Sequence, residues 1–228
     1  MSGNRVIAVI VAAGRGERMR GLDKVFAPLA GKPLLARTLA AFQNCALVEG
    51  IVVVVARHNI EHAKNMVMEY GLSKVMEICR GGQERWQSVA AGLEYIKDCR
   101  WVLIHDGARP LVTETLIARG LEAAAHTGAA VPAVPVTDTV KAIDAGGFVD
   151  ETLPRENLRA IQTPQVFRSD IIIKAYRSIG TGENPTDDAS LVERLGYRVK
   201  VFSGSYDNIK ITTPADMALA GVLIKGGK

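Results

Sequence analysis

Four basic side chains fall within ten residues of a glycine pair near the N-terminus. An apolar segment at residues 5–11 (RVIAVIV) runs into a loop whose glycines are Gly14 and Gly16. A glycine loop that leaves a buried strand can direct backbone N–H groups at an anion, and the missing Cβ atoms permit close approach. The pattern predicts a triphosphate-binding loop, although a solvated strand-to-helix turn would give the same pattern. Its basic residues are Arg15, Arg18, Arg20 and Lys24.

The spacing of this loop argues against two common phosphate-binding motifs. A dinucleotide fingerprint (GxGxxG) would place Met19 at its third glycine, and the second apolar segment ends at Arg57 without the acidic residue that binds a ribose. Residues 16–21 have the glycine spacing of a Walker A loop, but Leu22 and Asp23 follow where Lys and Ser or Thr are required. Neither an NAD-binding dehydrogenase nor a P-loop NTPase is therefore favoured.

A carboxylate follows directly on a later apolar segment, residues 100–105 (RWVLIH). Ligands of open α/β sheets bind beyond the carboxyl ends of the strands, so Asp106 is expected beside the Gly14 loop. A carboxylate in that position can hold Mg²⁺, which in turn bridges phosphate oxygens. An aspartate in an ordinary surface turn is the alternative. Asp207 and Lys210 would complete a site for metal and phosphate.

Apolar runs alternate with helix-like segments along most of the chain. This alternation predicts an α/β fold with a mostly parallel twisted sheet and helices on both of its faces. The 228 residues, 48% of them hydrophobic, suit a single domain spanning 1–228. We expect strands at residues 5–11, 50–56, 74–79, 100–105, 129–134, near 166 and at 198–202. We expect helices at residues 33–42, 58–70, 84–96, 113–126, from 169, from 187 and at 214–224, the last capped by Thr213.

The alternation stops between Pro135 and about Ile161, where polar and apolar residues alternate around Gly146 and Gly147. This pattern is typical of a β-hairpin with exposed faces. We therefore predict a protruding β-arm subdomain at about 136–160. Because such arms often pack on a second subunit, we also expect a homodimer formed through the arm.

Charge and cysteine content narrow the possible partners. The net charge of +4 is modest and shows no basic run, so we expect anionic small substrates and no nucleic acid. The longest apolar run near the N-terminus is too short to span a membrane, and we expect no membrane partner. Cys45, Cys79 and Cys99 form no CxxC pair, which favours reduced thiols in a cytoplasmic protein.

Seven short segments together carry a family resemblance. They occur in family order and cover nearly the whole chain: AAGRGERM with Lys24, GGQERWQSV (81–89), HDGARP (105–110), TDTVK (137–141), TPQ (163–165), TDDAS (186–190) and DNIKIT (207–212). On these segments the chain resembles the 2-C-methyl-D-erythritol 4-phosphate cytidylyltransferases of the non-mevalonate isoprenoid pathway. The resemblance implies a Rossmann-like nucleotidyltransferase that joins CMP from CTP to the acceptor and releases pyrophosphate.

The resemblance also implies roles for individual residues. Base and ribose recognition would fall to Gly82, Ser88 and the backbone of Ala12 and Ala13. The full nucleotide-binding set would be Ala12, Ala13, Gly14, Gly16, Arg18, Lys24, Gly81, Gly82, Arg85 and Ser88. The acceptor site would comprise Asp106, Arg109, Thr139, Arg155, Thr163, Asp207 and Lys210, with Thr139 and Arg155 of the arm able to serve the neighbouring subunit. Asp106 and Asp207 would bind Mg²⁺, and Lys24, Lys210 and Arg18 would be catalytic.

Two positions depart from the family pattern, and two rival functions stay open. Gly107 stands where Ala is usual, which suggests a looser turn, and Gln83 stands where Asp is common. A ribitol 5-phosphate cytidylyltransferase would have a similar triphosphate loop and differ mainly around Thr139, Arg155 and Thr163. A non-catalytic nucleotide-sensing module is the other rival, and the presence of Asp106 with both lysines argues against it.

Overall fold

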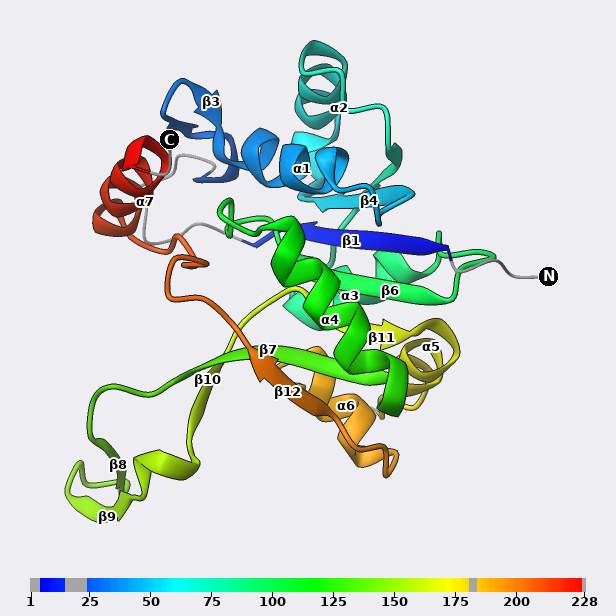
Figure 1. Ribbon diagram of the computed structural model, residues 1–228. Helices are drawn as coiled ribbons and strands as arrows, with labels where there is room; N and C mark the ends of the chain where they lie inside the picture. The colour runs from blue at the N-terminus through cyan, green and yellow to red at the C-terminus, as the bar shows by residue number, and fades with distance from the viewer. Residues whose placement is uncertain (1–4, 15–23, 181–183, 227–228) are drawn as a thin grey trace.

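The computed structural model describes residues 5–14, 24–180 and 184–226 (Figure 1). Its strands are β1 (Val6–Ala12), β2 (Pro28–Leu29), β3 (Lys32–Pro33), β4 (Gly50–Val55), β5 (Val75–Arg80), β6 (Trp101–Asp106), β7 (Ala129–Pro135), β8 (Val140–Ile143), β9 (Val149–Leu153), β10 (Arg159–Ile161), β11 (Gln165–Arg168) and β12 (Lys200–Ser203). Its α-helices are α1 (Leu34–Asn44), α2 (Ile60–Glu69), α3 (Arg85–Leu93), α4 (Glu114–Thr127), α5 (Ser169–Arg177), α6 (Asp188–Arg194) and α7 (Pro214–Gly226). Short 3-10 turns are η2 (Lys24–Phe26), η3 (Arg57–Asn59) and η4 (Arg155–Asn157).

One large sheet forms the body of the molecule, with the strand order β10-β7-β11-β6-β1-β4-β5 and β12 paired to β7. Strands β6, β1, β4 and β5 are parallel neighbours, and β12 is parallel to β7. Strands β11 and β10 run antiparallel to their neighbours. The prediction of a mostly parallel α/β sheet is therefore confirmed.

The two faces of this sheet bury two separate apolar clusters. Along β1, Ala8 and Ile10 belong to the cluster that α1, α2 and α4 cover, whereas Ile7 and Val9 face α3, α5 and α6. Successive strand residues point to opposite faces, so a strand that is covered on both sides must be apolar throughout. This requirement explains the unbroken apolar runs of β1, β4 and β6, and it confirms that helices lie on both faces.

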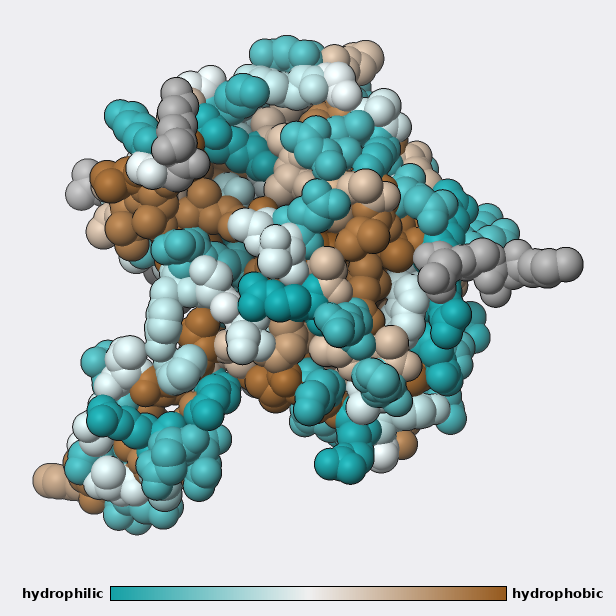
Figure 2. Space-filling view, viewed as in Figure 1, coloured by the Kyte–Doolittle hydropathy of each residue, from teal (hydrophilic) through white to brown (hydrophobic). Residues whose placement is uncertain are grey.

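Helix α7 closes the molecule beside β2 and β3, on top of a small cluster that contains Leu34, Ala108 and Ile211. The hydroxyl of Thr213 accepts the N–H of Asp216 at 3.2 Å, which confirms Thr213 as its N-cap. Leu219 and Val222 stay exposed, and Figure 2 shows a brown apolar surface over this helix. None of the helices in the described ranges is both long and apolar enough to cross a membrane.

A β-hairpin projects away from the sheet, as Figure 1 shows at the lower left. Its strands, β8 and β9, form a two-stranded sheet of their own among the described residues, and the turn between them contains Gly147 at a φ of +82°. The hairpin is shorter than the predicted arm, because residues 159–161 return to the main sheet as β10. Its apolar side chains Ile143, Phe148 and Val149 are exposed.

Candidate active site

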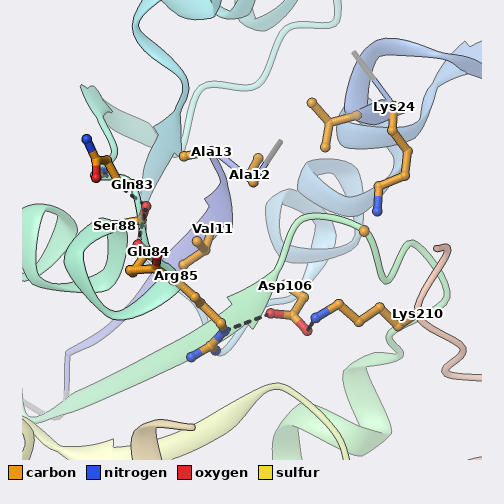
Figure 3. A pocket seen from close by; sticks show the side chains of 14 residues that line it. Val11, Ala12, Ala13, Lys24, Gln83, Glu84, Arg85, Ser88, Asp106 and Lys210 are labelled. Atoms are coloured by element: carbon orange, nitrogen blue, oxygen red, sulfur yellow. Dashed lines mark hydrogen bonds and ion pairs between the residues drawn. The ribbon is translucent and has the colours of Figure 1, made fainter. Parts of the chain in front are cut away.

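A cavity of about 170 Å³ opens where β1 and β6 end (Figure 3). The loop after β1, the turn η2, the segment before α3 and the loop between β12 and α7 supply its walls. The two parallel strands end at the same edge of the sheet, which brings together segments that are distant from one another in the chain. The lining residues are Val11, Ala12, Ala13, Gly14, Lys24, Val25, Gly82, Gln83, Glu84, Arg85, Ser88, Asp106, Ala108 and Lys210.

Asp106 is the acidic centre of this cavity, and three cations surround it. The Nζ atom of Lys210 lies 2.9 Å from Asp106 Oδ2, and the Nε atom of Arg85 lies 3.3 Å from Oδ1 (Figure 3). Arg109 approaches from the protein side, with its Nε atom 3.5 Å from Oδ2. Burial alone would raise the pKa of Asp106, but the positive charges of Lys210 and Arg85 outweigh it and lower that pKa well below its ordinary value. The carboxylate is therefore ionised at neutral pH.

A buried histidine fixes the turn that carries Asp106. The backbone carbonyl of Arg109 can only accept, so the His105 Nε2–H donates to it at 3.0 Å. His105 Nδ1 then accepts the hydroxyl of Thr163 at 3.0 Å, and the same hydroxyl oxygen accepts the Asp106 N–H at 3.1 Å. Burial lowers the pKa of His105 to about 4, so the ring stays neutral. His105 is thus both buried with its hydrogen bonds satisfied and engaged in orienting the Asp106 turn.

Two glycines permit the close approach of strand β5 to helix α3 beside the cavity. The N–H of Gly82 donates to Ser88 Oγ at 3.1 Å, and a Cβ atom at Gly81 would lie 2.6 Å from the same oxygen. Gln87 closes the helix start by accepting the N–H groups of Gln83 and Glu84 at 2.8 and 3.0 Å. The backbone of Gly82 and the side chain of Ser88 therefore form part of the cavity wall, beside Gln83, Glu84 and Arg85.

Comparisons with known proteins identify the family of this chain. The family model for 2-C-methyl-D-erythritol 4-phosphate cytidylyltransferase matches residues 6–226. The chain belongs to this family. It is 56% identical over 224 residues to the 2-C-methyl-D-erythritol 4-phosphate cytidylyltransferase of Dehalococcoides mccartyi, covering 98% of both chains. It is 48% identical to the enzyme of that name from Halalkalibacterium halodurans, with 95% of each chain covered.

Solved structures show the same similarity in three dimensions. The crystal structure of 4-diphosphocytidyl-2C-methyl-D-erythritol synthase from Anaerococcus prevotii matches 98% of this chain and 97% of its own, with a TM-score of 0.86 and 30% identity. The 2-C-methyl-D-erythritol 4-phosphate cytidylyltransferase of Thermus thermophilus matches 95% and 98%, with a TM-score of 0.77 and 35% identity. The Rossmann-like fold and the family resemblance that the sequence motifs predict are confirmed.

The predicted nucleotide-binding residues divide into three groups by their position in the structure. Most line the cavity, namely Ala12, Ala13, Gly14, Lys24, Gly82, Arg85 and Ser88. Gly81 lines a larger neighbouring cavity of about 650 Å³, with Arg57, His58 and Arg80. Gly16 and Arg18 lie outside the described residues, as do Arg15 and Arg20.

The predicted acceptor residues are more scattered. Asp106 and Lys210 line the cavity, whereas the partly buried Arg109 and the buried Thr163 do not line it. Arg109 donates from Nη1 to the carbonyl of Asn208 at 2.7 Å, and Thr163 serves the Asp106 turn. Their observed contacts hold Asp106 in place.

Three further predicted residues stay outside the cavity wall. Asp207 is exposed, and its N–H donates to the Ser205 hydroxyl at 3.1 Å. Thr139 and Arg155 are exposed on the arm side, where Arg155 Nη1 donates to the backbone carbonyl of Thr137 at 3.0 Å. A single subunit therefore does not bring these three side chains into the cavity.

The two departures from the family pattern have different surroundings. Gly107 does not loosen its turn, because its N–H donates to the Val11 carbonyl and its carbonyl accepts the Thr38 hydroxyl, both at 2.8 Å. A Cβ atom there would lie 2.9 Å from Ala12 Cβ, so the turn is tightly packed. Gln83 is exposed on the cavity wall, where its side chain can still reach a ligand.

The sequence did not predict that Asp188 and Tyr176 hold the Arg85 side chain. Both carboxylate oxygens of the fully buried Asp188 accept the Arg85 guanidinium, at 2.9 and 2.7 Å. The Tyr176 hydroxyl donates to the same carboxylate at 2.5 Å. The motif TDDAS was the available signal, because it placed Asp188 in a family segment, but the motif assigned no contact to it.

Proposed function

We propose that the chain transfers the cytidylyl group of CTP to 2-C-methyl-D-erythritol 4-phosphate and releases pyrophosphate. The observation that carries this proposal is the ionised Asp106 ringed by Lys210, Arg85 and Arg109 at one end of a cavity whose other wall is the Gly82–Ser88 segment. The family to which the chain belongs supplies the identity of the two substrates.

Mg²⁺ fits the groups that the cavity presents. Magnesium is usually held by one or two carboxylates together with substrate phosphates and water, so it needs no cage of protein ligands. Within the described residues no cluster of three His, Cys, Asp or Glu side chains could hold a metal, but the Asp106 carboxylate faces the cavity. Asp106 would supply one ligand, with Asp207 proposed as the second. The ion would neutralise charge on the triphosphate.

The protein side chains would position the two phosphates and stabilise charge. The acceptor is a phosphate monoester that is already anionic near neutral pH, so its oxygen can attack the α-phosphorus of CTP without a strong general base. Pyrophosphate leaves as the new P–O bond forms. Lys24 and Lys210 line the cavity and would balance the developing charge, and Arg18 is proposed to join them.

The arm completes the proposal through a homodimer. Thr139 and Arg155 are absent from the cavity wall of their own subunit, and the arm exposes Ile143, Phe148 and Val149. A two-fold dimer would bury these apolar side chains and bring each arm to the site of the other subunit. We propose that Thr139 and Arg155 hold the acceptor in this way.

The thiols are consistent with a cytoplasmic location, which we also propose. Cys45, Cys79 and Cys99 are all buried and free. Burial raises the pKa values of Cys79 and Cys99 to about 11, so both stay protonated and unreactive at neutral pH. Free thiols of this kind are usual in a reducing compartment.

The test is pyrophosphate release from each of the four NTPs with Mg²⁺, with 2-C-methyl-D-erythritol 4-phosphate and ribitol 5-phosphate as parallel acceptors. We expect release only with CTP and the methylerythritol phosphate. Release with ribitol 5-phosphate instead would reassign the acceptor and leave the nucleotide site unchanged. Binding of CTP without release in any pair would favour the nucleotide-sensing alternative.

A further inference from the structure

Among the described residues that line the cavity, Arg85 contacts two carboxylates. One is Asp106 in the cavity, and the other is the fully buried Asp188. The Arg85 Nη1 and Nη2 atoms donate to the two oxygens of Asp188 at 2.9 and 2.7 Å, and the Arg85 Nε lies 3.3 Å from Asp106 Oδ1. Asp188 begins α6, and Tyr176 comes from α5. The guanidinium thus joins the cavity to the two helices packed behind it.

The geometry limits how Arg85 can meet Asp106. A guanidinium prefers to bind a carboxylate through two parallel N–H donors, and here Asp188 takes both terminal nitrogens. That end-on pair is therefore not available to Asp106, whose contact with Arg85 is the single one from Nε, and Lys210 and Arg109 contact the other oxygen of Asp106. Tyr176 donates to Asp188 Oδ1 and fixes the orientation of that carboxylate.

Stability alone is a weak explanation for this buried arrangement. Removing an arginine and a carboxylate from water is costly, and apolar replacements of such pairs are often neutral or stabilising. Arg85 also keeps part of its side chain on the cavity surface, where charge position affects a bound phosphate.

We propose that Asp188, oriented by Tyr176, is a positioning residue for the transfer reaction: it keeps the two terminal nitrogens of Arg85 from making an end-on contact with Asp106. This proposal rests on the proposed function. Without the Asp188 charge, Arg85 would turn both terminal nitrogens toward Asp106 and occupy the carboxylate that the reaction needs. Misplacing a group at a reacting centre by about 1 Å can cost about 10²-fold in rate.

The test is a double-mutant cycle on kcat, started only after the wild-type chain shows pyrophosphate release with CTP and the acceptor. A wild-type chain without turnover would contradict the proposed function and end the cycle before it reached Asp188. Asp188→Asn keeps the shape and removes the charge, and we expect a kcat loss of about 10–100-fold with the KM for CTP changed by less than about 5-fold. In an Arg85→Gln background the same change should cost less than about 3-fold more.

Asp187→Asn is the matched control, because Asp187 caps α6 through Ser190 and contacts Gln165, with no contact to Arg85. It should lower Tm by a few degrees at most and leave kcat within about 3-fold. An active, folded Asp188→Asn variant with wild-type kcat would overturn the proposal. Equal losses in both Arg85 backgrounds, or an equal loss in the control, would also overturn it.

Tyr176→Phe serves if Asp188→Asn does not fold, since it removes only one hydroxyl from the group. We expect its kcat to fall about 3–10-fold, and this loss should disappear when Arg85 is Gln. An unchanged kcat in a folded Tyr176→Phe variant would count against the proposal.

Discussion

The cavity beyond β6 and the β8–β9 arm both carry predicted site residues, but their surroundings are opposite. In the cavity, Asp106 is buried and has ionic contacts with Lys210, Arg85 and Arg109. On the arm, Thr139 and Arg155 are exposed, and the hairpin strands form a separate two-stranded sheet in the described part of the chain. One region is already organised within a single subunit, whereas the other becomes part of a site only when a second surface meets it.

The largest effect should follow from removing the acidic centre of the cavity. Asp106→Asn leaves the surrounding cations without their shared partner, and we expect kcat to fall by about 10³-fold or more. Single-turnover measurements of pyrophosphate release would give the size of the loss, and circular dichroism would verify the fold. A loss below about 10-fold would show that the cavity does not owe its activity to this carboxylate.

A somewhat smaller loss is expected for the lysine that pairs with Asp106. Lys210→Ala removes a cation from the cavity, and we expect kcat/KM to fall about 10²–10³-fold, or about 3–4 kcal/mol. The matched control is Lys64→Ala, because Lys64 pairs with Glu61 at 2.8 Å on the exposed surface of α2. Comparable activity in the two variants would contradict a special role for Lys210.

The organised region should also make stability depend on pH. His105 has a folded pKa of about 4 against an ordinary value of 6.5, so between these values the unfolded chain binds the additional proton. The contribution is fully present above about pH 6.5 and is lost as the pH falls toward 4, to a limit on the order of 3 kcal/mol. The lowered pKa of Asp106 acts in the same direction, but only at pH values below the ordinary aspartate range.

Urea denaturation at pH 7.0, 6.0 and 5.0 would measure this dependence. The wild-type free energy of unfolding should fall over this interval, and it should fall less in His105→Asn, which has no ring to protonate. Equal slopes in the two proteins would show that the buried ring does not control acid stability.

The smallest effect should come from the arm. Arg155→Ala is expected to raise the KM for the acceptor about 10–30-fold, a loss of about 1.4–2 kcal/mol, with the KM for CTP almost unchanged. Mixing this variant with Asp106→Asn tests whether the arm of one subunit serves the cavity of the other. If the arm serves the partner's site, mixed dimers regain one intact site each, and about one quarter of wild-type activity should return. Failure to regain activity in verified mixed dimers would place Arg155 at its own subunit's site.

Local pattern was sufficient for the centre of the fold, because the strands β1, β4 and β6 are covered on both faces and had to be apolar throughout. The buried runs of β1, β4 and β6 and the Thr213 cap of α7 are all where local pattern places them. Local pattern was not sufficient to place the end of the arm. Residues 159–161 look like a hairpin strand in the sequence, but they pair with β7.

The candidate site shows the same division between local and distant information. Asp106 and Lys210 could be assigned from strand ends and family motifs, and the structure brings them to 2.9 Å. The contact of Arg85 with Asp188 joins positions 103 residues apart, and no spacing rule connects them. The same holds for Thr163, whose hydroxyl serves His105 and the Asp106 turn.

The sequence by itself determined the class of sheet, the family and the kinds of charged group available for phosphate chemistry. These properties depend on composition, periodicity and short motifs, which are local along the chain. Only the tertiary structure decided which cation faces which carboxylate, that His105 stays neutral, and that Thr139 and Arg155 lie apart from the cavity. Those properties depend on burial and on distances between remote segments, and both arise only when the strands pair and the helices pack onto the sheet.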